Sequence, residues 1–364
     1  MNLRHTITAF LMALLTAGGL SSCGSSSHGS HLLYVTTGQG IYAYRIDNKS
    51  RNSTAIFSAP FSVGNTSGGI VISPSGQFAY VANEDDNTIS LYKIDRVSGS
   101  LSEVLPRTPS GGFSPNSMVL DTSGSTLFVG NQLSNDVTAF SVGSGGALSH
   151  VSAPVPVGSQ PSNLVFANGL LFVAVPNFSR VYVFSGSSGA LTAVNGSPLI
   201  VSNGVASVTV DPSAKFLYSP SLANNTVSAF GIQYSSSTNT VSLALVPGSP
   251  FSVNLTTSST PPAPVAAILD AAATHLYVAN FAASSVSQFS VGTDGSLKLL
   301  TPATVSVGTN PALLAMDPDG KHMLVGNIGS KNITDLVINS DATLGSAGQS
   351  ITVPGAPQGL GITK

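Results

Sequence analysis

The chain has 364 residues and a formal net charge of −2, and only 8% of its residues are charged. Hydrophobic residues make up 42%, which excludes a disordered chain, because disorder goes with low hydrophobicity and high charge. The chain also has no basic excess of the kind that nucleic-acid binding needs, so we expect no nucleic-acid partner.

The first residues have the pattern of an export signal. Arg4 precedes the apolar run ITAFLMALLTAGG, which is too short to span a bilayer comfortably. LSSC follows at residues 20–23 and resembles a bacterial lipobox, in which the cysteine becomes the lipidated first residue of the mature protein. The alternative is an ordinary cleaved signal with an incidental cysteine. We expect residues 1–22 to be a lipoprotein signal peptide and residues 23–30 to be a flexible tether that starts at the lipidated Cys23.

Cys23 is also the single cysteine of the chain, so the mature fold has to hold without an intramolecular disulfide. No other segment has an uninterrupted apolar run of about 18 residues, so we expect membrane contact through the lipid on Cys23 alone. The expected location is the bacterial cell envelope, with the exported chain facing the periplasm or the surface.

A short phrase recurs seven times along the mature chain. Successive copies begin 46, 48, 44, 46, 59 and 47 residues apart. The copies are LYVTT at 33–37, AYVAN at 79–83, LFVGN at 127–131, LFVAV at 171–175, LYSPS at 217–221, LYVAN at 276–280 and MLVGN at 323–327. A period of roughly 40–50 residues is typical of one four-stranded blade of a β-propeller.

Each repeat has the same internal order. A short apolar segment such as IVI or LAM comes first, and a turn such as SPSG or DPDG leads to the repeated phrase. A third segment alternates with period two, as in TISLYKI at 88–94, and a Gly-containing turn opens a fourth. Prolines cluster just after this point, which suits an outer edge strand. No stretch of the mature chain has a sustained 3.6-residue period, so we expect little or no helix.

The two ends of the mature chain indicate how the ring closes. The first repeat starts at a second strand, HLLYVT from His31, and PQGLGIT at 357–363 matches the first-strand segments PNSMVLD and PALLAMD. We therefore predict an all-β, seven-bladed β-propeller of four-stranded blades over residues 31–364, in which the C-terminal strand completes the N-terminal blade. The aromatic residues of the phrases are expected to pack between blades.

YVAN followed by N-T-(I/V)-S resembles the repeat of the YVTN-type propellers, and within them the lactonase family, which includes bacterial 6-phosphogluconolactonase and the fungal carboxymuconate-lactonising enzymes. The resemblance covers residues 31–364. It implies the seven-bladed fold and a lactone hydrolase or cycloisomerase activity, although a fold does not fix a function.

The resemblance also implies a catalytic pattern that this sequence lacks. In the family, Pro-Arg-His typically precedes strand one in at least one blade, where Arg can bind an oxyanion and His can move a proton. The two positions after the aligned prolines here are Gly68-Gly69, Asn116-Ser117, Ser162-Asn163, Ala206-Ser207, Val265-Ala266, Ala312-Leu313 and Gln358-Gly359. None is charged and none is histidine. No GxSxG elbow or Gly-rich phosphate loop replaces them, so we assign no catalytic residue.

We expect the mouth of the central channel to bind a ligand through uncharged polar side chains, which can hydrogen-bond a sugar or a peptide. The candidates at the strand entries are Asn116, Ser117, Ser162, Asn163, Ser207 and Gln358. Arg180 and Lys331 are the candidate cations, because the turns between second and third strands lie on the same face.

Other chemically active residues receive no function. We expect all six histidines to be solvent-facing or satisfied locally, and the run Glu84-Asp85-Asp86 to form a solvated turn. No His/Asp/Glu cluster has the spacing of metal ligands, and we expect neither a metal nor a cofactor. Residues 234–264 form an insertion that is either a surface loop or a gate over one face.

Two functions remain. The first is an envelope-anchored binding or scaffold module, monomeric, whose partner is an unknown small molecule, glycan or envelope protein. The second is a lactone hydrolase or cycloisomerase. A phosphorylated sugar lactone fits the second poorly, because the mouth has no evident phosphate-binding Arg or Lys. A charged side chain at the channel would favour the enzyme, and a neutral channel would favour the binding module.

Overall fold

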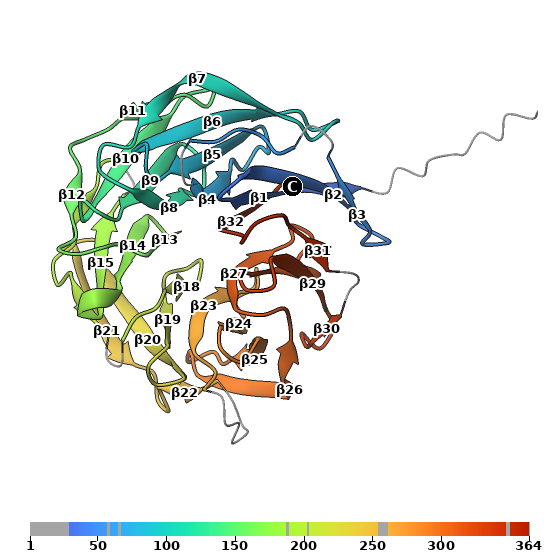
Figure 1. The fold of residues 1–364 in the computed structure, drawn as a ribbon. Coiled ribbons are helices and arrows are strands. Elements are labelled where there is room, and N and C mark those ends of the chain that lie inside the picture. The colour runs from blue at the N-terminus through green and yellow to red at the C-terminus, as the bar shows by residue number, and fades with distance from the viewer. Residues whose placement is uncertain are drawn as a thin grey trace, which may run out of the picture.

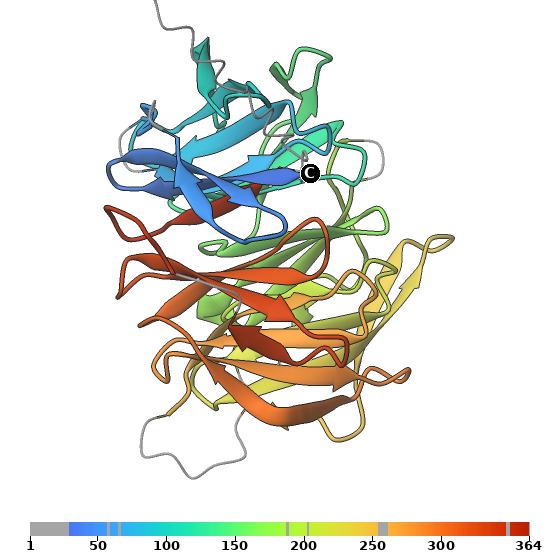
Figure 2. The same ribbon diagram turned by 90° about the vertical axis from the view of Figure 1, so that its right-hand side faces the viewer.

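The computed structural model describes residues 29–56, 59–64, 67–186, 189–201, 204–253, 261–346 and 350–363. The described strands form seven antiparallel sheets, which surround a central axis as the blades of a ring (Figure 1). A view from the side shows the sheets edge-on, one stacked on the next (Figure 2). The predicted seven-bladed β-propeller is confirmed. The only helical element among the described residues is the short 3-10 helix η1 (Pro176–Phe178).

Each blade runs from an inner strand at the axis to an outer strand at the rim, and we number the blades in chain order from the one that contains β1. The inner strands are β32 (Gly359–Ile362), β4 (Ser67–Ile72), β8 (Pro115–Leu120), β13 (Asn163–Ala167), β18 (Thr209–Val210), β23 (Pro264–Leu269) and β27 (Pro311–Met316). The second strands are β1 (Ser30–Thr37), β5 (Phe78–Asn83), β9 (Thr126–Asn131), β14 (Leu170–Val175), β19 (Phe216–Ser221), β24 (His275–Asn280) and β28 (His322–Asn327).

The outer half of each blade is less regular. The third strands are β2 (Gly40–Asp47), β6 (Thr88–Ile94), β10 (Asp136–Val142), β15 (Arg180–Ser185), β20 (Thr226–Ser235), β25 (Ser285–Val291) and β29 (Asn332–Ile338). The unbroken outer strands are β3 (Ser53–Ala55), β7 (Leu101–Pro109) and β26 (Leu297–Ser306). The outer strands in two pieces are β11 (Leu148–His150) with β12 (Val155–Pro156), β16 (Thr192–Ala193) with β17 (Leu199–Ile200), β21 (Thr240–Leu245) with β22 (Phe251–Ser252), and β30 (Leu344–Ser346) with β31 (Ile351–Thr352).

The predicted closure of the ring is also confirmed. Blade 1 has the strand order β3-β2-β1-β32, so its inner strand comes from the C-terminal end of the chain. The pairing runs from Leu33 opposite Ile362 to Thr36 opposite Gly359. Outer strands contain prolines, as expected. Pro106 in β7 and Pro302 in β26 each fall within a shift of the register, where a missing N–H costs little.

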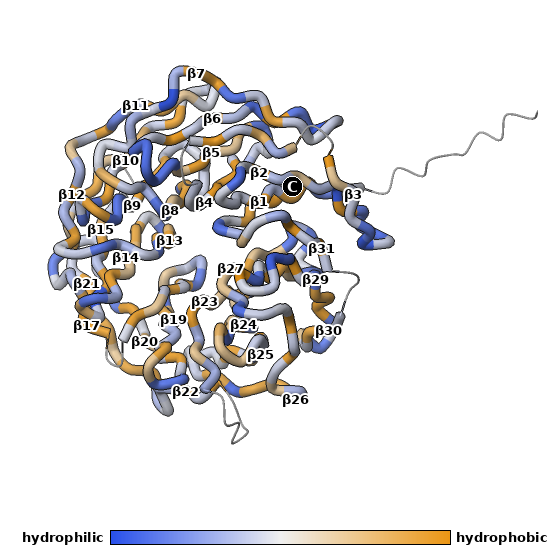
Figure 3. The backbone as a smooth tube through the Cα atoms, viewed as in Figure 1, coloured by the Kyte–Doolittle hydropathy of each residue, from blue (hydrophilic) through white to orange (hydrophobic). Residues whose placement is uncertain are grey.

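The hydrophobic core is divided into seven clusters, each formed by two adjacent blades. One cluster joins Tyr34 and Ala43 of blade 1 to Val81 and Tyr92 of blade 2, and the other six repeat the arrangement around the ring. Hydrophobic and hydrophilic residues alternate along the strands (Figure 3). The second strands are instead buried along their whole length, as in β14 with the sequence LLFVAV, so both faces of a blade have apolar side chains to bury against the neighbouring blades. The expectation that the phrases pack between blades is confirmed.

The tyrosine of the repeated phrase adds a polar link to this packing. Its hydroxyl donates a hydrogen bond to a backbone carbonyl in the turn between the third and outer strands of the next blade. The pairs are Tyr34 to Gly99, Tyr80 to Gly146, Tyr218 to Gly295 and Tyr277 to Ala342, at 2.9–3.1 Å. Burial raises the pKa of Tyr80 to about 12, so the hydroxyl stays protonated and able to donate.

The seam between blade 7 and blade 1 is joined by charged residues instead. Leu324 stands where other blades have Tyr or Phe, and Arg51 stands where the acceptor turn has glycine. The Arg51 guanidinium lies 2.8 Å from carboxylate oxygens of both Asp317 and Asp335 in blade 7, and all three residues are buried. Arg51 therefore ties the first blade to the last.

Two histidines join this seam: His322 finds its partner in the neighbouring strand of its own blade, as expected, whereas His31 corrects the sequence-based expectation. His31 Nδ1 lies 3.0 Å from the carbonyl of Thr363, and its Nε2 lies 3.2 Å from Asp317. His322 Nδ1 lies 3.3 Å from Asp335. Both were expected to be solvent-facing or satisfied locally. Both are buried, and the partners of His31 are brought to it only by ring closure.

Candidate functional site

All seven inner strands begin at the same face of the ring, and we call this end of the channel the mouth. In four blades the inner strand starts with a shift of register against the second strand, located at Ser67/Ile70, Pro115/Ser117, Pro264/Ala266 and Pro311/Leu313. Such bulges re-aim side chains and are frequent next to active sites. In blade 3 the shift leaves Asn116 as the extra residue between the paired Pro115 and Ser117.

Asn116 and Ser117 each present a buried atom without a hydrogen-bond partner among the described residues. These atoms are Asn116 Oδ1 and Ser117 Oγ. Gly130 in β9 makes room for the hydroxyl, because a Cβ atom there would lie 2.6 Å from Ser117 Oγ. Buried polar groups are nearly always satisfied, so two orphaned atoms on adjacent residues indicate a place for a ligand or for water.

Glu84 brings a carboxylate to the same place. It directly follows Asn83 at the end of β5, in the turn to the third strand of blade 2. A Cβ atom on Gly68 would lie 2.9 Å from Glu84 Oε1 and 3.2 Å from Asn116 Cα. Gly68 therefore leaves the space that the carboxylate occupies, and it sets Glu84 beside Asn116 across the junction of blades 2 and 3.

The electrostatics of Glu84 differ from those of a solvated turn. Burial, helped by the neighbouring charge of Asp85, raises the pKa of the Glu84 carboxyl above its ordinary value of 4.5. Among the described residues, no hydrogen bond or ion pair to the Glu84 side chain is formed. The expectation of a solvated turn holds for the exposed Asp85, while Asp86 pairs with Arg107 at 3.3 Å. The same expectation of a solvated position is wrong for Glu84, whose side chain is half-buried.

Three other candidates at the mouth serve the contact between blades. Asn163 Oδ1 accepts a hydrogen bond from the backbone N–H of Val208 at 2.9 Å. The Ser207 hydroxyl donates to the carbonyl of Val265 at 3.0 Å, and Ser162 makes a longer contact of 3.4 Å to the carbonyl of Ala206. Each side chain bridges to the following blade, so its free hydrogen-bonding capacity is reduced.

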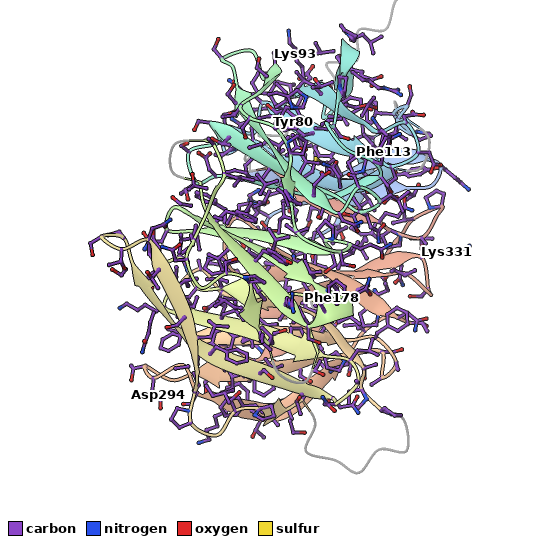
Figure 4. All side chains as sticks on the ribbon, turned by 90° about the vertical axis from the view of Figure 1, so that its left-hand side faces the viewer. Tyr80, Lys93, Phe113, Phe178, Asp294 and Lys331 are labelled. Atoms are coloured by element: carbon purple, nitrogen blue, oxygen red, sulfur yellow. The ribbon has the colours of Figure 1, made fainter. Side chains whose placement is uncertain are left out.

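The remaining candidates are Gln358 and the two cations. Gln358 is exposed at the entry of β32 and meets the hydroxyl of Ser67 at 3.3 Å. Arg180 and Lys331 begin or precede third strands, two strands out from the inner ones. Arg180 lies 5.8 Å over the ring of Phe178, and Lys331 is exposed on the mouth side of the ring (Figure 4). The structure thus places the Glu84 carboxylate near the backbone of Asn116, directs the Ser117 hydroxyl toward Gly130 on the side of blade 4, and leaves both cations at the periphery.

The mouth face also carries exposed apolar side chains in its turns. These are Phe113, Leu133, Phe178, Leu222 and Ile328, with exposed fractions from 37% to 66%. Phe113 and Phe178 lie toward this face in Figure 4, whereas Asp294 marks the opposite side. Sequence reasoning missed this set and missed Glu84. The sequence did contain a signal for Glu84. The residue directly follows the repeated phrase of blade 2, and the strand entry of the same blade is the one that consists of two glycines, Gly68-Gly69.

Other kinds of site are not formed by the described residues. They contain no group of three or more His, Cys, Asp and Glu side chains that could hold a metal ion. No helix among them is long and apolar enough to cross a bilayer.

A cavity of about 410 Å³ lies at the outer part of the ring between β22 and β26. It is lined by Phe251 and Leu299 among others, and Lys298 is the single charged residue of its lining. It is separate from the mouth. Cys23 and part of the 234–264 insertion lie outside the described residues.

Comparisons with known proteins agree with this architecture. The family model described as "Lactonase, 7-bladed beta-propeller" matches residues 49–166 and 180–358. No curated protein matches the chain. A candidate 6-phosphogluconolactonase from Bacteroides fragilis is 19% identical, with a TM-score of 0.77 over 93% of this chain and 99% of that one. The periplasmic gluconolactonase of Pseudomonas aeruginosa is 20% identical, with a TM-score of 0.75 over 92% and 99%. A streptogramin B lyase is 14% identical, with a TM-score of 0.55 over 83% and 89%.

Proposed function

The chain belongs to the family of seven-bladed β-propeller lactonases, and from this membership we propose that it hydrolyses a neutral lactone at the mouth, with Glu84 as the general base. The observation that carries the proposal is the half-buried Glu84 carboxylate beside the backbone of Asn116, at a strand entry where Asn116 Oδ1 and Ser117 Oγ are buried without a partner. A carboxylate with a raised pKa is a stronger base than an ordinary one, and perturbed groups cluster at functional sites.

The proposed reaction uses these three side chains in separate roles. A water molecule attacks the lactone carbonyl carbon while the Glu84 carboxylate accepts a proton from it, and the Ser117 hydroxyl donates a hydrogen bond to the carbonyl oxygen. The bond between the acyl carbon and the ring oxygen then breaks. The proton held by Glu84 passes to the ring oxygen, so the product is the open hydroxy acid. Asn116 orients the water or the substrate through its amide.

The charge at the site favours an uncharged substrate. Glu84 shares its turn with Asp85 and Asp86, and the candidate cations Arg180 and Lys331 lie at the periphery. An anionic phosphate or carboxylate group would be repelled by the turn. A neutral sugar lactone, the class that the Pseudomonas aeruginosa neighbour's description names, fits better than a phosphorylated one.

An envelope-anchored binding or scaffold module remains the second candidate. It is supported by the described strand entries, which hold neither Arg nor His, and by the engagement of Ser162, Asn163 and Ser207 with neighbouring blades. In this role a glycan, small molecule or envelope protein would occupy the mouth without reaction.

Hydrolysis of a lactone panel separates the two candidates. The panel contains neutral sugar lactones, neutral alkyl lactones, 6-phosphogluconolactone and muconolactone-type compounds, each corrected for spontaneous ring opening. We expect saturable turnover of neutral lactones, and a decrease in kcat of about 10²–10⁴-fold in Glu84→Gln. The matched control, Asp85→Asn in the same turn, should keep its activity. Rates equal to the blank across the panel would support the binding module.

The fold of the variant can be checked in the same experiment. Because the pKa of Glu84 in the folded state lies above its unfolded value, ionisation disfavours the folded state as pH rises through that pKa. Glu84→Gln removes this loss of folded-state stability, because glutamine does not ionise. We therefore expect its Tm at neutral pH to equal or exceed that of the wild type, so that lost activity is not lost structure.

We propose further that the chain is exported and anchored to the envelope as a monomer by lipid on Cys23. Support for an orientation comes from β1, whose Ser30 end lies at the face opposite the mouth. Its Thr37 end meets Ser67 at the mouth through a hydrogen bond of 2.7 Å, while His31 meets Asp317 at the far face. A tether that enters at the far face would turn the mouth away from the membrane.

A further inference from the structure

Two of the exposed apolar side chains at the mouth belong to the blade that carries Asn116. Phe113 and Leu133 are 62% and 66% exposed. Phe113 precedes Asn116 by three residues, so the backbone places the two within about 10 Å. The remaining exposed apolar residues of this face belong to blades 4, 5 and 7, away from the junction of blades 2 and 3 where Glu84 and Asn116 lie.

The backbone holds this apolar pair in a fixed arrangement. The N–H of Leu133 donates to the carbonyl of Phe113 at 3.0 Å, and the N–H of Gln132 donates to the carbonyl of Ser114 at 2.8 Å. The N–H of Phe113 donates to the hydroxyl of Ser134 at 2.9 Å. The strand-entry loop and the turn after β9 are therefore tied together, and they carry Phe113 and Leu133 on adjacent segments of backbone beside the strand entry with Asn116.

We infer that Phe113 and Leu133 form a subsite for an alkyl side chain on the lactone. The inference rests on the proposed function and narrows its substrate class to neutral lactones with an apolar tail. The polar group of such a substrate fits Glu84, Asn116 and Ser117, and its tail covers two side chains that are otherwise exposed to water. Neither a phosphorylated nor a free sugar lactone offers an apolar group to this surface.

A chain-length series tests the subsite. The probes are γ-lactones whose alkyl side chain grows from none to eight carbons, all neutral and with the same ring. For the wild type we expect kcat/KM to rise by up to about fourfold for each methylene group that the subsite buries, because each one removes apolar surface from water. The double variant Phe113→Ala/Leu133→Ala should lose this dependence while hydrolysing the unsubstituted lactone at the wild-type rate. Leu222→Ala, an exposed leucine in the corresponding turn of blade 5, is the matched control and should leave the dependence unchanged.

The outcomes separate the subsite from the activity itself. Hydrolysis without chain-length dependence, or a dependence that survives in the double variant, would overturn the subsite and leave the lactone hydrolase standing. A dependence lost equally in Leu222→Ala would also overturn it, because the effect would then be general to the apolar face. Absence of hydrolysis with every lactone would overturn the proposed function and the subsite together.

Discussion

The asparagine of the repeated phrase shows at the scale of single residues why the phrase recurs. Asn83, Asn131, Asn280 and Asn327 are fully buried at the end of their second strands. Each Nδ2 group donates to side chains at the start of the third strand, as Asn280 does to Ser285 at 3.2 Å and Ser287 at 2.7 Å. The residues N-T-x-S that follow the phrase are its hydrogen-bond partners. The motif is therefore structural, and it fixes the turn from which Glu84 reaches the mouth.

The tyrosine of the phrase should contribute measurably to stability through its hydroxyl. Tyr80→Phe removes the hydrogen bond to the buried carbonyl of Gly146 while keeping the ring packed. We expect a loss of about 1–2 kcal/mol in the free energy of unfolding, measured by urea denaturation. Tyr42→Phe is the control, because the Tyr42 hydroxyl meets Gln39 at an exposed position. Equal stability of both variants would mean that the links between blades carry no net energy.

Ring closure depends on two features of the elements at the ends of the chain. Four residues of β32 pair with β1, and the Arg51 cluster joins blade 1 to blade 7. The pairing could be predicted from the sequence, because PQGLGIT repeats the first-strand pattern. The cluster could not, because Arg51 and Asp317 are 266 residues apart and Asp317 reads in the sequence only as the first residue of the turn DPDG. Its members meet only when the ring has closed.

Removing the cation of this cluster should open the seam. Arg51→Met leaves the buried carboxylates of Asp317 and Asp335 without their main partner, and we expect a loss of about 3–5 kcal/mol in the free energy of unfolding. Arg107→Met breaks the more exposed pairs with Glu103 and Asp86 and should cost no more than about 1 kcal/mol. Urea denaturation of both variants gives the comparison. A loss in Arg51→Met no larger than in Arg107→Met would contradict a role for the cluster in closure.

The candidate site was predictable only in part because, as in the Arg51 cluster, its residues come from different blades. Asn116 and Ser117 follow from the strand-entry pattern, and the structure leaves both with orphaned atoms. Glu84 reads in the sequence as one member of an acidic turn. Its burial follows from the contact with Gly68 and Asn116 across two blades, which a single repeat does not reveal. Arg180 and Lys331 share the face with the mouth, but two strands separate them from the channel.

The whole molecule is a ring with two different faces, and its orientation follows from where β1 starts. Strand β1 enters at the face opposite the mouth, so a lipid on Cys23 would leave the mouth directed away from the membrane. The seven clusters between blades, together with the seam, make the ring a single structural unit. The turns of the mouth face carry Glu84 and the apolar side chains on this rigid support.

The lipid anchor can be tested on the full chain expressed in a bacterium. Labelling with an alkyne analogue of palmitate should mark the wild-type protein in the membrane fraction. Cys23→Ser should abolish the label and move the protein out of that fraction, because no other cysteine is present. An unlabelled wild type, or a labelled Cys23→Ser variant, would show that LSSC is not a lipobox here.

The dependence of kcat/KM on pH tests the central claim most directly, because it reports the ionisation of the proposed base in the free enzyme. Burial raises the pKa of Glu84 above 4.5, and the base acts only when ionised. We predict that kcat/KM for a neutral lactone falls tenfold per pH unit below an apparent pKa above 4.5, and that this fall is absent from the residual activity of Glu84→Gln. Full activity below pH 4.5, or the same fall in Glu84→Gln, would contradict the assignment of Glu84 as the base.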